Sequence, residues 1–132
     1  MTVRHATAWS AFPLTGERVR LDLTHGTAGT LTRLADGVVA GRFSLSEDEG
    51  ALVVGELVVE DPYRGYGLGT EAGRLLRDFA DAGGWPLLRA WAHPDLGLSV
   101  YFWVRMGLQP RFGEGPNGGI WFERAVGVAR LT

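Results

Sequence analysis

The sequence from residue 57 to residue 70 is Leu57-Val58-Val59-Glu60-Asp61-Pro62-Tyr63-Arg64-Gly65-Tyr66-Gly67-Leu68-Gly69-Thr70. It joins a β-branched strand pattern to a glycine-rich turn and to the start of a helix. A helix that begins at Leu68 leaves its first backbone N–H groups without intrahelical partners, and the helix dipole places positive potential there. Glycines at 65, 67 and 69 let the backbone approach an anion without a Cβ atom in the way. The stretch therefore predicts a loop that holds a diphosphate.

Other glycine-rich motifs fit this stretch less well. A dinucleotide fingerprint needs Gly-x-Gly-x-x-Gly with an acidic residue about 20 positions later, whereas the spacing here is Gly65-x-Gly67-x-Gly69 and no second βαβ unit follows. A P-loop needs Gly-Lys-Ser/Thr, which the sequence lacks. The plain alternative, a glycine turn that joins strand to helix and binds nothing, stays open.

The loop resembles the signature of the GNAT superfamily of N-acetyltransferases, Arg/Gln-x-x-Gly-x-Gly/Ala, through Arg64, Gly67 and Gly69. Weaker likenesses extend over most of the chain: residues 3–7 look like the family's opening strand, 35–41 like its first hairpin, and 102–108 like the end of its second helix. The resemblance implies an α/β (α+β) fold with a mixed, mostly antiparallel central sheet and a cofactor-binding helix after the central strand. It also implies acetyl-coenzyme A as co-substrate.

The resemblance assigns cofactor contacts to two groups of residues. The backbone of Leu57, Val58 and Val59 would splay from the next strand beside Pro62, pair with pantetheine amides as an added strand does, and polarise the acetyl carbonyl through an N–H group. The diphosphate would lie on the loop and the first helical turn, that is on Arg64, Gly65, Tyr66, Gly67, Leu68, Gly69 and Thr70.

Length and composition narrow the function classes. The 132 residues fit one domain, 1–132, and the net charge of −2 gives no basic surface for nucleic acid. The chain has no cysteine and three isolated histidines, so we expect no disulfide, no thiolate site and no metal. No apolar run approaches the roughly 18 residues of a membrane span, and the start lacks a signal peptide, so we expect a cytoplasmic protein without membrane contact.

Periodicity predicts the order strands, helix, strand, helix, hairpin. Gly83-Gly84 would end the first helix, His25 to Gly29 and Glu47 to Gly50 would be turns, and Asp36-Gly37 signals a hairpin. The near-continuous apolar run 51–60 indicates a central strand covered on both faces. The expected strands are 3–8, 19–24, 30–34, 38–45, 51–60, 87–92, 108–112 and 120–125, and the expected helices are 68–82 and 96–106, the latter capped by Asp95 and ended by Gly107.

The first helical region should be shortened. In the GNAT fold two helices lie between the first two strands and help to form the acceptor site, whereas here only Trp9 to Gly29 occupy that interval. An open acceptor side favours a peptide, a protein terminus or another large amine. The alternative is that residues 3–8 are not the first strand of the fold, in which case Trp9 to Gly29 are not the interval between the first two strands.

Amine acetylation needs a base more than an acid. Deprotonating an amine with a pKa of about 10.4 costs about 4 to 5 kcal/mol at pH 7, whereas protonating a thiolate leaving group with a pKa of about 8.5 involves only about 2 kcal/mol. Glu56, directly before Leu57, is the nearest strand carboxylate and the candidate catalytic base. Its alternative role is that of a solvated or salt-bridged strand residue.

The position of the family's usual acid departs from the pattern. The tyrosine commonly found four residues before the glycine that ends the second helix is Trp103 here, and Tyr101 lies about 200° away around the helix. The asparagine that often touches pantetheine is Leu96, while the small residue Ser99 is retained. A degenerate member that binds coenzyme A or a partner without catalysis is therefore a second hypothesis. Transfer of a longer acyl group is a third.

Two further features remain open. His93, beside Pro94, is a turn residue or a base at a strand end. Exposed strand edges and the many aromatic residues are compatible with a homodimer.

Overall fold

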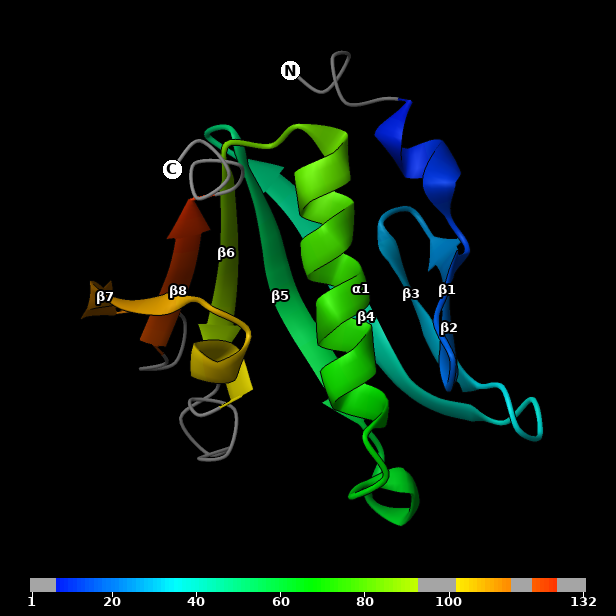
Figure 1. Cartoon of the computed structure of the whole chain (residues 1–132). Coiled ribbons are helices and arrows are strands. Elements are labelled where there is room, and N and C mark those ends of the chain that lie inside the picture. The colour runs from blue at the N-terminus through cyan, green and yellow to red at the C-terminus, as the bar shows by residue number, and fades with distance from the viewer. Residues whose placement is uncertain (1–6, 93–101, 115–119, 126–132) are drawn as a thin grey trace.

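A mixed sheet forms the centre of the computed structural model, which describes residues 7–92, 102–114 and 120–125 (Figure 1). The described residues form eight strands: β1 (Leu14–Thr15), β2 (Val19–His25), β3 (Ala28–Arg33), β4 (Val39–Asp48), β5 (Ala51–Val59), β6 (Leu87–Ala92), β7 (Gln109–Glu114) and β8 (Ile120–Ala125). Their order in the sheet is β1-β2-β3-β4-β5-β6-β8-β7, and only β5 and β6 are parallel neighbours. The predicted mostly antiparallel α+β architecture is confirmed.

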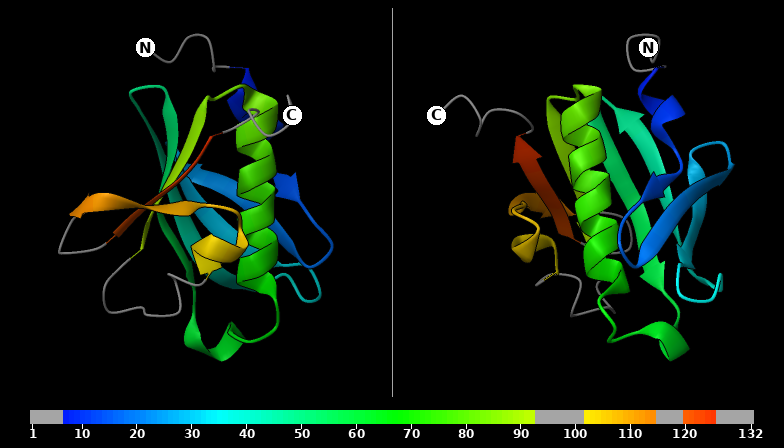
Figure 2. Two further views of the ribbon diagram at one scale, coloured as in Figure 1. Left: turned by 60° about the vertical axis from the view of Figure 1, so that its left-hand side comes forward. Right: turned by 45° about the vertical axis from the view of Figure 1, so that its right-hand side comes forward.

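The helix α1 (Leu68–Gly83) makes the crossover between the parallel strands β5 and β6. Its apolar residues recur every three or four positions, so one face is buried against the sheet: Leu68, Ala72, Leu76, Phe79 and Ala80. Gly84 adopts a left-handed conformation with φ of +82° and ends the helix, as its position after the apolar repeat predicts. Figure 2 shows that α1 lies along one face of the curved sheet.

The N-terminal segment packs on α1 through aromatic rings. The short 3-10 helix η2 (Ala8–Ala11) carries Trp9, whose ring centroid lies 5.2 Å from that of Phe79 and 5.6 Å from that of Trp85. Phe12 lies 4.9 Å from Phe79 by the same measure. Trp85 is fully buried, and its indole N–H donates a 2.7 Å hydrogen bond to Glu47 Oε1. These contacts close one end of the core.

The predicted start of the chain is wrong where the structure describes it. The expected strand 3–8 lies mostly outside the described residues, but Ala8 belongs to the 3-10 helix η2. The short strand β1 follows, and it pairs with β2. Only Gly26 and Thr27 separate β2 from β3. The interval from Trp9 to Gly29, where the sequence predicts a shortened helical region, therefore contains most of η2, β1, β2 and the first residues of β3. No α-helix lies in it, and the link between β2 and β3 is a turn of two residues.

Most other elements lie where the sequence places them. Strands β6 and β8 have the predicted bounds, and Gly37 has the positive φ of +73° that the hairpin requires. The acidic turn is shorter than expected, because β4 continues to Asp48 and only Glu49 and Gly50 form the turn. Residues 102–105 are helical and Gly107 has a φ of +92°, which agrees with a helix that ends there. Residues 96–101, with the cap Asp95, lie outside the described part.

Candidate functional site

The strands β5 and β6 separate halfway along β5. Their pairing runs from Ala51 with Leu87 to Val54 with Ala90 and stops there, while β5 stays paired with β4 as far as Val59 with Gly41. The register of β4 and β5 shifts at the same place, so Gly55 is an extra residue in β5. Beyond this bulge, no described strand pairs with the β6-facing edge of β5.

The hydrogen bonds show which residues present their backbone to that edge. The N–H of Glu60 donates to the carbonyl of Ala40, at 2.8 Å, so Glu60 faces β4. Because backbone groups alternate along a strand, Val58 also faces β4, whereas Leu57 and Val59 face the open edge. The carbonyl of Val59 already accepts a 2.7 Å hydrogen bond from Arg64 Nε. Leu57 is therefore the residue best placed to pair with an extended ligand.

The loop after β5 leads directly to the open edge and to the start of α1. It contains the 3-10 turn η3 (Asp61–Tyr63), and Arg64 pairs with Asp61 at 2.6 Å while bonding Val59. Arg64 thus holds the two ends of the turn together, a structural role that the motif alone does not indicate. Gly65 and Gly67 have φ of +88° and +80°, values that residues with a Cβ rarely adopt.

The N-terminus of α1 is open to a ligand. Gly67 is the N-cap and has no side chain, so no side-chain hydrogen bond caps the helix. The first N–H groups, those of Leu68, Gly69 and Thr70, have no partner within the helix. The side chain of Leu68 is buried in the core, which fixes the helix start against the sheet. Backbone donors and the helix dipole therefore point to the end of the loop, where an anion is favoured.

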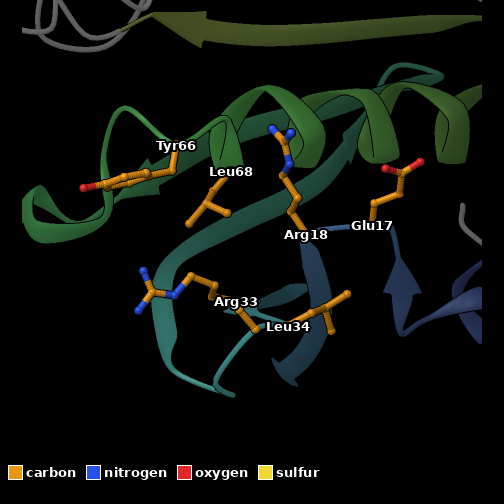
Figure 3. A pocket seen from close by; sticks show the side chains of 7 residues that line it. Glu17, Arg18, Arg33, Leu34, Tyr66 and Leu68 are labelled. Carbon is orange, nitrogen blue, oxygen red and sulfur yellow. The ribbon is translucent and has the colours of Figure 1, made fainter.

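A pocket of about 450 Å³ lies beside this loop (Figure 3). Its lining comes from three parts of the chain: Glu17 and Arg18 before β2, Arg33, Leu34 and Ala35 after β3, and Tyr66 and Leu68 of the loop and helix. Tyr66 is 65% exposed and Leu34 is 37% exposed, so the pocket offers apolar surface as well as charge.

The residues before β2 are tied to the first turn of α1. Glu71 Oε1 accepts hydrogen bonds from the backbone N–H groups of Arg18, at 2.7 Å, and Val19, at 2.8 Å. In Figure 3 the Arg18 side chain points toward the start of the helix. Sequence reasoning missed both Arg18 and Glu71, because the contact joins segments far apart in the chain. The only local signal is that Glu71 is an acidic residue in a first helical turn.

The candidate base Glu56 lies on the other face of β5. Its neighbours Leu57 and Val59 pack against the core beneath α1, so alternation places Glu56 on the opposite face. Its Oε1 accepts a 3.1 Å hydrogen bond from Arg42 Nε, and Arg42 also donates to Glu60 Oε1 at 2.8 Å. The Glu56 side chain is 44% exposed, so solvent or an acceptor can reach it.

A second charged pair borders the pocket. The Arg33 guanidinium bonds both carboxylate oxygens of Asp36 and lies 4.9 Å from the centre of the Tyr63 ring. The hydrogen bond from Arg33 holds the pKa of Asp36 below its usual value, and the same bond raises the pKa of Arg33. Arg33 is therefore occupied within the protein.

Trp103, at the position of the family's usual tyrosine, is a core residue. It is 4% exposed, its ring centroid lies 4.8 Å from that of Phe102, and its carbonyl accepts hydrogen bonds from Met106 and Leu108. The other residues considered for this region, His93, Leu96, Ser99 and Tyr101, lie outside the described residues. Among the described residues, no group of acidic and histidine side chains could hold a metal ion, and no helix is long and apolar enough to cross a membrane.

The chain shares its fold with solved acetyltransferase structures. No protein-family profile and no curated protein matches the sequence. A protein from Vibrio cholerae that is described as a ribosomal-protein-serine acetyltransferase superposes with a TM-score of 0.74, at 14% identity, over 86% of this chain and 97% of its own.

Two longer proteins match in the same way. A GNAT-family acetyltransferase from Bacillus anthracis superposes with a TM-score of 0.66, at 13% identity, over 76% of this chain and 66% of its own. The yncA protein from Salmonella typhimurium, solved with its cofactor acetyl-CoA, superposes with a TM-score of 0.63, at 18% identity, over 75% of this chain and 65% of its own. The alignment thus spans about two thirds of the length of these two proteins.

Proposed function

Because the chain has the fold of the GNAT acetyltransferases, we propose that it is an N-acetyltransferase that moves an acetyl group from acetyl-coenzyme A to an amine. The observation that carries the proposal is the open edge of β5 beside an uncapped helix N-terminus. An extended pantetheine arm needs the first feature and a diphosphate needs the second.

The residues fit acetyl-coenzyme A at both ends of this site. Leu57 presents its backbone at the open edge for the pantetheine amides, while Val58 and Val59 keep the strand in place through β4 and Arg64. Gly65, Gly67, Gly69 and Thr70 leave the helix N-terminus accessible to phosphate oxygens. Arg64 and Tyr66 contribute as a loop brace and as exposed aromatic surface, respectively. The bound thioester supplies the activated acetyl group.

Glu56 is the proposed general base. It takes a proton from the acceptor ammonium, directly or through water, which supplies the neutral amine that the reaction needs. The amine nitrogen then forms a bond to the acetyl carbon while a backbone N–H group of β5 stabilises the carbonyl oxygen. The carbon–sulfur bond breaks and the nitrogen gives up its second proton to solvent, which leaves the neutral amide. The thiolate takes a proton from solvent, because Trp103 offers no acid of the usual kind.

A large acceptor fits the architecture best. The link between β2 and β3 is a two-residue turn, so the two helices of the family that stand between the first strands are absent at this point. The neighbour from Vibrio cholerae is described as acting on a ribosomal protein, and it aligns over nearly its whole length. We therefore propose a peptide, a protein terminus or another large amine as acceptor.

A degenerate module that binds coenzyme A without transfer is the second candidate. The buried Trp103 favours it, since the position usually held by an acid is part of the core. The homodimer, the cytoplasmic location and the absence of nucleic-acid binding stay predictions of the sequence.

Two measurements together test the proposal. Calorimetric titration with acetyl-coenzyme A should show one site per chain, and thiol release should require an added peptide or amine. Binding without thiol release across small amines and peptides would favour the module, and absence of binding would contradict both functions.

A further inference from the structure

We propose that Arg18 binds the diphosphate of coenzyme A together with the first turn of α1, and that Glu71 positions Arg18 for this task. The inference rests on the proposed function and adds a cofactor-binding residue from outside the glycine loop.

Glu71 fixes the backbone that carries Arg18. Its Oε1 accepts two short hydrogen bonds, from the N–H groups of Arg18 and Val19. The approach is close, since a Cβ atom on Gly16 would collide with the Glu71 carboxylate. Because Glu71 belongs to the first turn of α1, this contact ties the start of β2 to the N-terminus of the helix.

The Arg18 side chain lies against the loop itself. A Cβ atom built on Gly67 would lie 2.7 Å from Arg18 Nη1, so the guanidinium is next to the N-cap of α1. An anion held by the N–H groups of the first turn would therefore be within reach of Arg18. Arginine suits this task because its planar fork of donors matches phosphate oxygens.

The guanidinium of Arg18 differs from those of the neighbouring arginines because no described carboxylate pairs with it. Arg33 is paired with Asp36, Arg42 with Glu56 and Glu60, and Arg64 with Asp61. None of the ion pairs among the described residues includes the Arg18 guanidinium, although Glu17 lines the same pocket. In Figure 3 the Glu17 carboxylate lies on the far side of Arg18 from Tyr66.

The first test compares charge-removing variants by calorimetry. Arg18→Gln should weaken binding of coenzyme A and of dephospho-coenzyme A by the same factor, about 10-fold, because both carry the diphosphate. The slope of log Kd against log salt concentration should also become shallower. Arg20→Gln is the matched control, because Arg20 lies two residues after Arg18, in β2, with its guanidinium on Asp22, and it should change neither Kd.

The second test separates positioning from general stability. Glu71→Ala should weaken binding in the native background but add little in the Arg18→Gln background, since both changes remove one interaction. If the losses of binding free energy in the two single variants simply add in the double variant, the positioning role of Glu71 is overturned. Should Glu71→Ala fail to fold, Glu71→Met enters the same cycle, because it keeps a side chain of similar length and removes the acceptor oxygen of both hydrogen bonds.

The outcomes distinguish this inference from the proposed function. Unchanged Kd in Arg18→Gln, or a loss confined to coenzyme A with its 3′-phosphate, overturns the assignment of Arg18 to the diphosphate. A native protein that binds no coenzyme A contradicts the proposed function itself, and this inference with it.

Discussion

At the residue scale, the site depends on a few positions where the backbone itself is the functional group. Gly67 combines a left-handed φ with close contact to Arg18, whereas Gly84, at the other end of α1, has nearly the same φ and nothing within 4 Å of a built Cβ. A comparison of the two positions therefore separates the effect of positive φ, which both glycines share, from the effect of crowding against Arg18, which only Gly67 has.

Gly67→Ala and Gly84→Ala should therefore differ in binding but share a stability loss. We expect each to lower the free energy of unfolding by about 1 kcal/mol, because a residue with a Cβ is strained at positive φ. Only Gly67→Ala should also weaken coenzyme A binding, by about 10-fold or more, because it displaces Arg18 and obstructs the helix N-terminus. Urea unfolding and calorimetry measure the two effects. Equal Kd values for the two variants would contradict the placement of the anion.

Glu56 and Glu60 provide a second matched pair, since both accept hydrogen bonds from Arg42. Glu56→Gln should lower kcat by about 100-fold or more, the range of a lost general base, with an unchanged Kd for acetyl-coenzyme A. Glu60→Gln should leave kcat near the native value. Steady-state kinetics with a peptide acceptor test this. Similar losses of kcat in both variants would contradict the role of Glu56 as the base and would indicate that catalysis depends on the position of Arg42, which both carboxylates hold.

At the element scale, two devices build the site: the bulge at Gly55 that ends β5–β6 pairing, and the aromatic packing that fixes α1. The first creates the open edge. The second holds the helix whose N-terminus meets that edge, so the stability of α1 and the geometry of the site are linked.

Phe79→Ala should lower the free energy of unfolding by about 3 to 5 kcal/mol, because Phe79 is buried and contacts Trp9, Phe12 and Trp85. Val104→Ala, at a side chain that is 50% exposed, is the control, with an expected change of at most about 0.5 kcal/mol. Chemical denaturation measures both. A small loss in Phe79→Ala would show that the N-terminal segment does not depend on this contact.

The β3–β4 hairpin should respond to acid through Asp36. Arg33 depresses the pKa of this carboxyl group in the folded protein, so its ionised form stabilises the fold. That contribution is complete above the ordinary pKa of 3.8 and is lost as the pH falls through the lower folded value. Asp36→Asn should therefore be less stable than the native protein at pH 7 and equally stable at strongly acidic pH. Urea unfolding at several pH values tests this. Asp78→Asn is the control, because Asp78 Oδ1 lies 3.7 Å from Arg77 Nε and the Asp78 side chain is 69% exposed, so its ion pair is weak.

At the scale of the whole molecule, one curved sheet brings the start of β2, the end of β5 and the N-terminus of α1 to the same end of the fold (Figures 1 and 2). A ligand bound there contacts segments from both halves of the chain. Binding should therefore stabilise the fold as a unit.

Acetyl-coenzyme A at 100 times its Kd should raise the free energy of unfolding by about 2.7 kcal/mol. For a chain of this size the melting temperature should rise by about 10 °C. Hydrogen exchange should slow at Leu57 and at the first turn of α1 and stay unchanged in the β2–β3 turn. A melting temperature that does not change with ligand concentration would contradict the proposed site.

Local patterns in the sequence determined much of this protein. The apolar repeat and flanking glycines specify α1, Asp36-Gly37 specifies its hairpin, and alternation places β6 and β8, because each of these features depends on residues within a few positions of one another. The glycine loop, too, is read from consecutive residues.

Only the tertiary structure decided the rest. The end of β5–β6 pairing at Val54, the contact of Glu71 with the backbone of Arg18, and the packing of η2 on α1 all join segments that are distant in the chain. Strand registers and such contacts depend on which surfaces meet when the sheet curves around the helix, and no local propensity carries that information. For this reason the sequence predicted a phosphate-binding loop, while the arginine beside it became visible only in the folded chain.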